Sequence, residues 1–261
     1  MTANAPLPES GAELASVRLL ALGDGAVTLQ FGTEISAEAN ARVLGFCRAL
    51  SQAVRRGEFT SVVEWAPAFA SVTVHADDIE EAAAAARDAK LLALAESAAP
   101  LRASGRRWRL PACFDSRHAP DLEALAHSRG LATQQVIELL AGTTFRVYML
   151  GFLPGFPYLG DLPEAIAVPR LATPRREVPE RSIAIAGRMC AVYPWTSPGG
   201  WHLVGRTPAR LFDAAADEPA LLAPGDEVTW SPIDAETYDE LEQRAASGKL
   251  PRAEWLVPAT S

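Results

Sequence analysis

Gly151-Phe152-Leu153-Pro154-Gly155-Phe156-Pro157-Tyr158-Leu159-Gly160 and Tyr193-Pro194-Trp195-Thr196-Ser197-Pro198-Gly199-Gly200-Trp201 are the two stretches that decide the fold. Proline fixes φ and removes a backbone donor, so this part of the chain cannot be one long helix or a set of central strands. Short strands are predicted around the two stretches, at 145–150, 182–186, 191–193, 201–204 and 227–233. Short strands separated by Gly/Pro turns favour a closed or nearly closed β-barrel.

The first half of the chain predicts a different arrangement. Its apolar patterns indicate strands at 17–20, 26–31, 62–65 and 71–75, a helix from the cap Ser36 to Arg55, and a second helix from Asp77 and Asp78 to Ser97. The order strand, strand, helix occurs twice. This order predicts a small α/β sandwich of the split βαβ type.

These patterns divide the chain into a polar tail at 1–15, an N-terminal α/β domain at 16–98, a linker reaching residue 106 and a barrel domain at 106–261. A strand at 108–111 opens the barrel domain. Asp121 is expected to cap a helix that ends near Ser128, and Thr133 to cap another at 134–140. A terminal helix is expected at 235–246. The predicted fold class is α+β, a small α/β sandwich followed by a β-barrel.

Composition and charge exclude several classes of function. The chain has 261 residues and a net charge of −8, which argues against a nucleic-acid partner because such a partner needs a basic face. No apolar stretch is long enough to span a membrane, and no secretory signal is visible, so we expect a cytoplasmic protein. The three cysteines, Cys47, Cys113 and Cys190, are widely spaced, which fits a reducing compartment. Cys190 is expected to be a buried small hydrophobe rather than a nucleophile.

Two further classes of chemistry are excluded by missing motifs. Only Lys90 and Lys249 are lysines, and neither lies in a Gly-rich loop, so a Walker-type phosphate loop is absent. No Met-Lys-Met motif is present, so no biotin is expected on this chain. The four histidines lack metal-ligand spacing, and no metal site is expected.

The aromatic loop allows two interpretations. Phe156 and Tyr158 form the wall of a pocket, with Gly155 letting the backbone approach a ligand, or these rings plug the end of the barrel. Ser197-Pro198-Gly199-Gly200-Trp201 is either a nest of backbone amides for an anion or a tight turn that buries Trp201.

Arginines follow prolines twice in the segment between the two stretches. Pro169-Arg170 and Pro174-Arg175 place two planar guanidinium forks on a stiffened loop, which suits a carboxylate or a phosphate. The alternative is a pair of surface salt bridges, which contribute little to stability. Arg206-Thr207-Pro208 lies close behind and offers another contact to an anion.

The motifs occur in a fixed order: G-F-x-P-G-F-P-Y-L-G, two P-R pairs, Y-P-x-x-S-P-G-G-W, G-R-T-P, L-F-D and P-G-D-x-V. In this order they resemble the family of 5-oxoprolinase B subunits, also named allophanate hydrolase subunit 1 and including Kip-type sporulation-kinase inhibitors. The chain is also similar to one half of the carboxyltransferase domain of urea carboxylase. The resemblance covers nearly the whole chain.

The resemblance implies that the barrel is cyclophilin-like and that the chain works with a second cyclophilin-like protein, the C subunit. Together the two would activate 5-oxoproline with ATP and Mg held by the assembly, and a lactam-hydrolase subunit would complete its conversion to glutamate. It implies catalytic roles for Arg175 and Arg206. It implies substrate-binding roles for the remaining motif residues, which are Phe156, Tyr158, Arg170, Ser197, Gly199, Gly200 and Trp201.

The chain departs from the family pattern in three places. Leu140 stands where the family has His, Arg181 where it has Gly, and Met189-Cys190-Ala191 where it has Gln-Thr-Gly. Two alternatives to the catalytic subunit therefore stay open. One is a regulatory inhibitor of a sensor histidine kinase, and the other is a divergent subunit of the urea carboxylase or allophanate hydrolase type.

Overall fold

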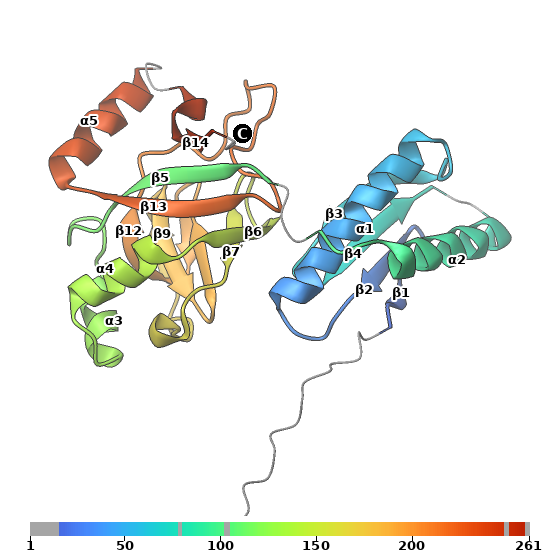
Figure 1. Cartoon of the computed structure of the whole chain (residues 1–261), viewed down its shortest axis with the longest axis horizontal. Coiled ribbons are helices and arrows are strands. Elements are labelled where there is room, and N and C mark those ends of the chain that lie inside the picture. Colours follow the sequence, from blue (N-terminus) through green and yellow to red (C-terminus); the bar gives the residue numbers. More distant parts are fainter. Residues whose placement is uncertain (1–15, 78–79, 102–104, 248–250, 259–261) are drawn as a thin grey trace, which may run out of the picture.

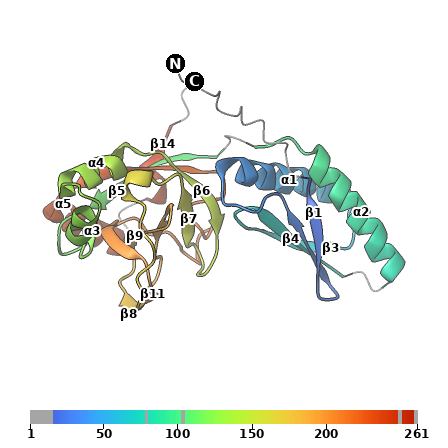
Figure 2. The same ribbon diagram turned by 90° about the horizontal axis from the view of Figure 1, so that it is seen from below.

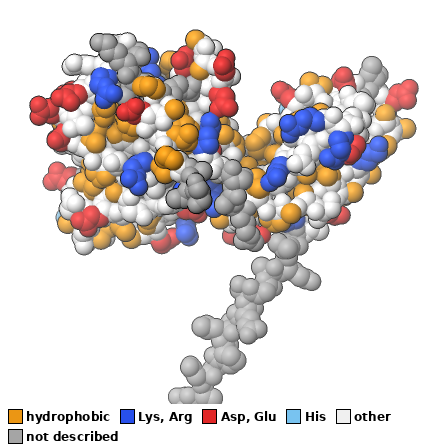
Figure 3. Space-filling model, turned by 45° about the horizontal axis from the view of Figure 1, so that its top comes forward, with side chains coloured by type: hydrophobic (Ala, Val, Ile, Leu, Met, Phe, Trp, Pro, Cys, Tyr) orange, Lys and Arg blue, Asp and Glu red, His pale blue; other side chains and the backbone are white. Residues whose placement is uncertain are grey.

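The computed structural model describes residues 16–77, 80–101, 105–247 and 251–258, and it places them in two lobes that lie side by side (Figure 1). The expected tail at 1–15, Asp78 and the middle of the expected linker lie outside these ranges. Basic and acidic side chains are interspersed over both lobes on the face shown in Figure 3. Among the described residues, no helix has both the length and the apolar run needed to cross a membrane.

The N-terminal lobe is a four-stranded sheet with two helices on one face (Figure 2). Its elements are β1 (Arg18–Leu22), β2 (Ala26–Gln30), α1 (Ala37–Arg55), β3 (Val62–Pro67), β4 (Ser71–Ala76) and α2 (Glu81–Ser97). The strand order is β1-β2-β4-β3, and every neighbouring pair is antiparallel. Strands β2 and β3 are therefore parallel with β4 between them, and α1 connects them. This is the predicted split βαβ unit.

The core of this lobe lies between the sheet and the helices. Leu29 and Val72 from the sheet pack against Phe46 and Leu50 of α1 and Leu91 of α2, all fully buried. Each such side chain contributes about 1.5–3 kcal/mol when it leaves water. The α/β sandwich is therefore held mainly by one apolar layer, as the alternating and helical apolar patterns predicted.

The two helices of this lobe begin differently from one another. Helix α1 begins as predicted, since the Ser36 side chain accepts a hydrogen bond from the amide of Ala39 at 3.1 Å. The prediction that Asp77 begins α2 is wrong, because the helix begins at Glu81. The Asp77 amide instead donates to the Ser61 carbonyl at 3.1 Å, so this residue still follows the extended path of β4.

The second lobe is a closed seven-stranded barrel. Its strands are β5 (Arg107–Cys113), β6 (Phe145–Leu150), β7 (Pro157–Gly160), β9 (Ser182–Ala186), β10 (Met189–Val192), β12 (His202–Arg206) and β13 (Glu227–Ile233). They are ordered β12-β9-β10-β7-β6-β13-β5, and pairing of Arg206 with Cys113 joins β12 back to β5. The predicted α+β class and the predicted barrel are confirmed.

Smaller elements surround the barrel. They are α3 (Leu122–Ser128), α4 (Thr133–Gly142), η1 (Glu164–Ile166), α5 (Ala235–Ala246), η2 (Arg252–Trp255), the edge strand β14 (Leu256–Val257) and the two-stranded sheet of β8 (Arg175–Val178) with β11 (Ser197–Gly199). Figure 2 shows β8 and β11 at the lower end of the barrel.

Side chains alternate between the inside and the outside of the barrel. Ile183 and Ile185 of β9 belong to the inner core, whereas Ala184 and Ala186 face a separate aromatic cluster on the outer surface. Cys190 is fully buried in the inner core, as predicted, and burial raises the pKa of its thiol. Leu140 of α4, one of the departures from the family pattern, also packs in this core with no exposure. An imidazole there would need a buried hydrogen-bond partner.

Several expected boundaries in this lobe are wrong. Helix α4 is capped at Ala132 rather than Thr133, and the side chain of Gln135 accepts from the Ala132 amide at 2.8 Å. Strands β7, β8 and β11 were expected as loops or turns. Pro157 is tolerated in β7 because it is the first residue of the strand. Strand β10 begins two residues before the expected 191–193 and ends one residue earlier. Strand β12 begins one residue after the start of the expected 201–204 and ends two residues later.

Candidate functional site

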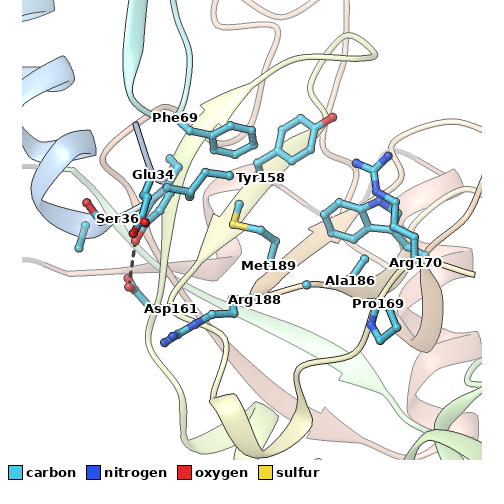
Figure 4. Close-up of a pocket in the computed structure, with 15 residues that line it drawn as sticks. Glu34, Ser36, Phe69, Tyr158, Asp161, Pro169, Arg170, Ala186, Arg188 and Met189 are labelled. Carbon is cyan, nitrogen blue, oxygen red and sulfur yellow. Dashed lines mark hydrogen bonds between the residues drawn. The ribbon is translucent and has the colours of Figure 1, made fainter. Parts of the chain in front are cut away.

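A pocket of about 800 Å³ lies between the two lobes (Figure 4). The N-terminal lobe contributes residues 34–37, which lead into α1, and Phe69 from the turn between β3 and β4. The barrel lobe contributes the outer surface of β6, β7, β9 and β10, the turn between β9 and β10, and the segments around residues 161, 170 and 201. These barrel residues are Tyr148, Tyr158, Asp161, Pro169, Arg170, Ala186, Gly187, Arg188, Met189 and Trp201.

Aromatic rings form one wall of this pocket. Tyr158 meets Phe69 edge-on with 5.2 Å between ring centroids, and lies 6.0 Å from Trp201. Phe156 is 2% exposed and packs behind Tyr158 at 5.0 Å, so it supports the wall without lining the pocket. The rings cover the outer surface of the barrel, which agrees with the wall interpretation and not with a plug at the barrel end. Gly155 packs its backbone on Phe212 instead of facing a ligand, because a Cβ there would lie 2.8 Å from the Phe212 Cβ.

Two arginines stand on opposite sides of the pocket (Figure 4). Arg188 pairs with Glu164 at 3.1 Å. The guanidinium of Arg170 lies 5.8 Å from the centroid of the Trp201 ring and has no carboxylate partner in the described part of the chain. An arginine stacked on an aromatic face and free of an ion pair is available to an anion.

Hydroxyl groups and carboxylates complete the polar lining. The Tyr148 hydroxyl donates to Asp161 at 3.0 Å, and burial together with Asp161 raises the pKa of Tyr148. Burial also raises the pKa of Tyr158, so its hydroxyl is protonated at neutral pH. This hydroxyl lies on the same side of the wall as the Arg170 guanidinium (Figure 4). Tyr158 and Arg170 can therefore contact one carboxylate together.

The pocket residues that come from the N-terminal lobe, 34–37 and Phe69, were not predicted from the sequence as part of a site. Ser36 was predicted only as a helix cap, and Phe69 attracted no functional prediction. Asn40, which is fully buried, donates to the main-chain oxygens of Phe69 at 3.2 Å and of Tyr148 at 3.1 Å. A buried polar side chain in an otherwise apolar helix face is the signal that could have indicated a contact between lobes.

The structure separates the two residues expected to be catalytic from this pocket. Arg175 and Arg206 line a smaller hollow of about 190 Å³ in the barrel lobe. Arg175 pairs with Asp121 at 2.5 Å and also donates to the Trp201 carbonyl at 3.3 Å. Asp121 was expected to cap α3, but its side chain makes no cap and accepts from the Leu203 amide at 2.6 Å. Arg170 and Arg175 therefore do not form a single clamp.

Within the S-P-G-G-W stretch, Trp201 lines the interdomain pocket, and residues 197–200 line neither this pocket nor the smaller hollow. Ser197 and Gly199 lie in β11, and neither Gly199 nor Gly200 has a positive φ, so the nest of amides is not formed. Gly199 is needed for packing, because a Cβ there would lie 2.2 Å from the Tyr193 hydroxyl. The alternative, a tight turn that buries Trp201, holds for the burial of Trp201, but residues 197–199 form strand β11 instead of a turn.

The departures from the family pattern have clear locations. Met189 is 8% exposed and borders the interdomain pocket, near its middle in Figure 4. Arg181 adopts a φ of +62°, a value that favours glycine, and its buried side chain pairs with Glu180 and with Glu242 of α5. No group of three or more His, Cys, Asp or Glu that could hold a metal occurs within the residues the structure describes.

A split βαβ sandwich joined to a closed barrel, with an aromatic pocket at the junction, defines a two-lobed α+β protein. The chain belongs to the family described as carboxyltransferase domain, subdomain C and D, whose model matches residues 17–222. It is 35% identical to the 5-oxoprolinase B subunit of Bacillus subtilis over 86% of this chain and 96% of that protein. It is 37% identical to the 5-oxoprolinase B subunit of Escherichia coli O157:H7 over 82% of this chain and 95% of that protein.

The fold is also found in a larger solved protein. The crystal structure of the K. lactis urea amidolyase matches 94% of this chain with a TM-score of 0.71 and 22% identity. The chain spans 16% of the length of that protein. At this identity the likeness shows a shared fold.

Proposed function

We propose that this chain is the B subunit of a 5-oxoprolinase, which opens the lactam ring of 5-oxoproline to give glutamate. Two relatives that carry this name match nearly their whole length. The ring C–N bond breaks, the oxygen of water adds to the carbonyl carbon, and the nitrogen takes up protons to become the amine of glutamate. An amide is stable, so hydrolysis of ATP to ADP and phosphate, with magnesium held by the assembly, would supply the driving force.

The observation that carries the proposal is the guanidinium of Arg170 beside the rings of Trp201 and Tyr158. 5-Oxoproline is a nearly flat ring with one carboxylate. Arg170 would pair with the carboxylate, and the aromatic wall would pack against the ring. The pocket volume of about 800 Å³ lies within the range of roughly 300–1,000 Å³ that is usual for small-molecule sites. It leaves room for a second molecule beside 5-oxoproline.

The proposal includes partners, since the names of the two relatives imply a multi-subunit enzyme. We propose a cyclophilin-like C subunit and a lactam-hydrolase subunit. The catalytic roles of Arg175 and Arg206 and a cytoplasmic location stay predictions. The regulator of a sensor kinase and the divergent urea carboxylase or allophanate hydrolase subunit also stay alternatives.

The test uses the chain co-expressed with both partner subunits. We expect hydrolysis of ATP that depends on 5-oxoproline and that yields glutamate. Arg170→Gln should raise the KM for 5-oxoproline at least about tenfold, because it removes a charged hydrogen bond to the carboxylate. Arg176→Gln is the matched control, since Arg176 is exposed on β8 and lies outside the pocket lining. A complete, folded assembly with no 5-oxoproline-dependent ATP hydrolysis would sink the proposal.

A further inference from the structure

The smaller hollow in the barrel lobe has a distinctive lining. Its volume of about 190 Å³ is well below the roughly 300 Å³ at which sites for drug-sized molecules begin. Arg117, His118, Arg175 and Arg206 line it together with Glu177. These residues come from the segment before α3, from β8 and from the end of β12. Three guanidinium groups and an imidazole thus converge on a space that suits one small polar group.

Among the arginines that line the hollow, Arg206 has no carboxylate partner in the part of the chain that the structure describes. Arg117 pairs with Asp239 at 2.9 Å, and Arg175 pairs with Asp121 at 2.5 Å. The Nε of Arg206 donates to the Glu180 carbonyl at 2.9 Å. No carboxylate lies within ion-pair distance of Arg206 in the portion of the chain that is described, and its two terminal nitrogens have no acceptor there. Glu177 is the one acidic residue of the lining, and it is exposed.

A buried imidazole adds a second observation. His118 is 8% exposed, and its Nε2 has no hydrogen-bond partner among the described residues. Its ring lies 4.3 Å from the ring of Tyr238, whose buried hydroxyl also lacks a partner. Arg206 lies 5.8 Å above the same Tyr238 ring. Buried polar atoms are rarely left without a partner, and of these groups His118 and Arg206 line the hollow, so a ligand bound there can pair with them.

The electrostatic environment of His118 favours a bound anion. Burial lowers the pKa of His118, and Arg117 and Arg206 lower it further. A neutral imidazole offers one N–H to an acceptor without a second charge in the lining. Arg117 and Arg206 each act on the imidazole more strongly than Asp239 and Glu242, whose carboxylates oppose them, and a positive field in a small hollow attracts an anion.

We propose that this hollow binds a small oxyanion, a phosphate group or a carboxylate, through the free guanidinium nitrogens of Arg206 and the imidazole of His118. Arg117 and Arg175 complete the lining from the other sides. The oxyanion supplies acceptors for donors that the protein leaves unpaired, and charge-assisted hydrogen bonds to guanidinium groups are among the stronger ones in proteins. The site is separate from the interdomain pocket, so the proposal does not depend on 5-oxoprolinase activity.

The test is calorimetric titration of the full chain with inorganic phosphate in one arm and with acetate in the other. We expect saturable binding in at least one arm, and the arm that binds identifies the oxyanion. Arg206→Gln should weaken binding at least about tenfold, because it removes a charged donor. His118→Gln should weaken it less, because glutamine keeps a polar side chain without the ring. Arg176→Gln, whose exposed side chain lies outside the lining of both cavities, should bind with wild-type affinity.

Circular dichroism of each variant shows whether it is folded, and His118→Gln keeps the proposal testable if Arg206→Gln fails to fold. Absence of saturable binding in both arms overturns the proposal. Wild-type affinity in a folded Arg206→Gln and in His118→Gln overturns it as well. Loss of binding in Arg170→Gln, with the two hollow variants unaffected, would move the anion to the interdomain pocket and overturn it in the same way.

Discussion

The side-chain amide of Asn40 in α1 donates to the main-chain oxygen of Tyr148 in β6 at 3.1 Å, and so joins residues that are 108 positions apart. The same amide donates to Phe69 at 3.2 Å. Tyr148 and Phe69 both line the interdomain pocket, from opposite lobes. One buried amide thus connects the two sides of the pocket.

Removal of this amide should therefore cost stability. Asn40→Ala leaves two carbonyls without their donor, and we expect a loss of about 1–3 kcal/mol in the free energy of unfolding. Asn40→Asp should cost more at neutral pH, because a carboxylate would face two carbonyl oxygens in a buried position. Urea denaturation measures both. Equal stability of the Asp and Ala variants would contradict this account of the contact.

Gly160 in β7 leaves the space that the Tyr148 ring occupies. A Cβ at this position would lie 2.2–2.6 Å from atoms of that ring, so the ring would have to move. We expect Gly160→Ala to destabilise the protein by about 1–3 kcal/mol, as overpacking usually does. Gly142→Ala is the matched control, because nothing lies within 4 Å of its Cβ and it ends α4. Thermal unfolding of the two variants should separate them clearly, and a similar melting temperature for both would argue against the predicted clash.

Arg181 combines a left-handed backbone with a buried ion pair to Glu242 of α5. Arg181→Ala removes the pair and keeps the unfavourable φ, whereas Arg181→Gly removes the pair and relaxes the backbone. We expect the Gly variant to be more stable than the Ala variant by about 1 kcal/mol, the usual cost of this conformation for a residue with a Cβ. Chemical denaturation at pH 7 measures the difference. If the Ala variant matched or exceeded the Gly variant, the φ of +62° would not be a source of strain.

Burial raises the pKa of the Cys47 thiol from 9.0 to about 12. The unfolded chain therefore loses this proton at lower pH than the folded one, so the contribution of Cys47 is fully present below about pH 9 and is lost as pH rises toward 12. We expect the free energy of unfolding to fall in this window by at most about 1.4 kcal/mol per pH unit for this thiol. Cys47→Ala should flatten the decline relative to wild type. Denaturation curves at stepwise alkaline pH check this, and an unchanged slope in the variant would remove Cys47 as a cause.

The elements that sequence analysis located best are those whose apolar pattern is long and bounded by clear signals. Helix α1 was found from its cap Ser36, and β6, β13 and α5 were found at their full length. The short strands β7, β8 and β11 were missed, because strands of three or four residues carry too few side chains for an alternating pattern. Asp121 shows the same limit at a single residue. Its sequence position marks a helix start, but its carboxylate serves Arg175 and the Leu203 amide, which only the folded chain brings near.

Only some residues of the candidate site were predicted from the sequence, because the segments that line it meet only in the folded chain. Tyr158, Arg170 and Trp201 were expected together and do line one pocket. Phe156 was expected beside them and lies behind the wall. Arg175 and Arg206 share a different hollow with His118, a residue that had no role in the sequence-based site. Motifs that are close along the chain can face opposite ways on a strand pair, because successive side chains alternate in direction.

Local sequence was enough to establish that a proline-rich, aromatic barrel follows a split βαβ sandwich, since proline geometry and apolar periodicity act over short distances along the chain. The order of the motifs in the second half was enough to indicate the family. Folding in three dimensions was needed to place the pocket between the lobes and to make residues 34–37 and Phe69 a third of its lining. It was also needed to place Arg175 and Arg206 in a separate hollow. These outcomes rest on contacts between distant segments, such as the buried amide of Asn40 on Tyr148 and the ring of Phe69 on Tyr158, and no local pattern encodes such contacts.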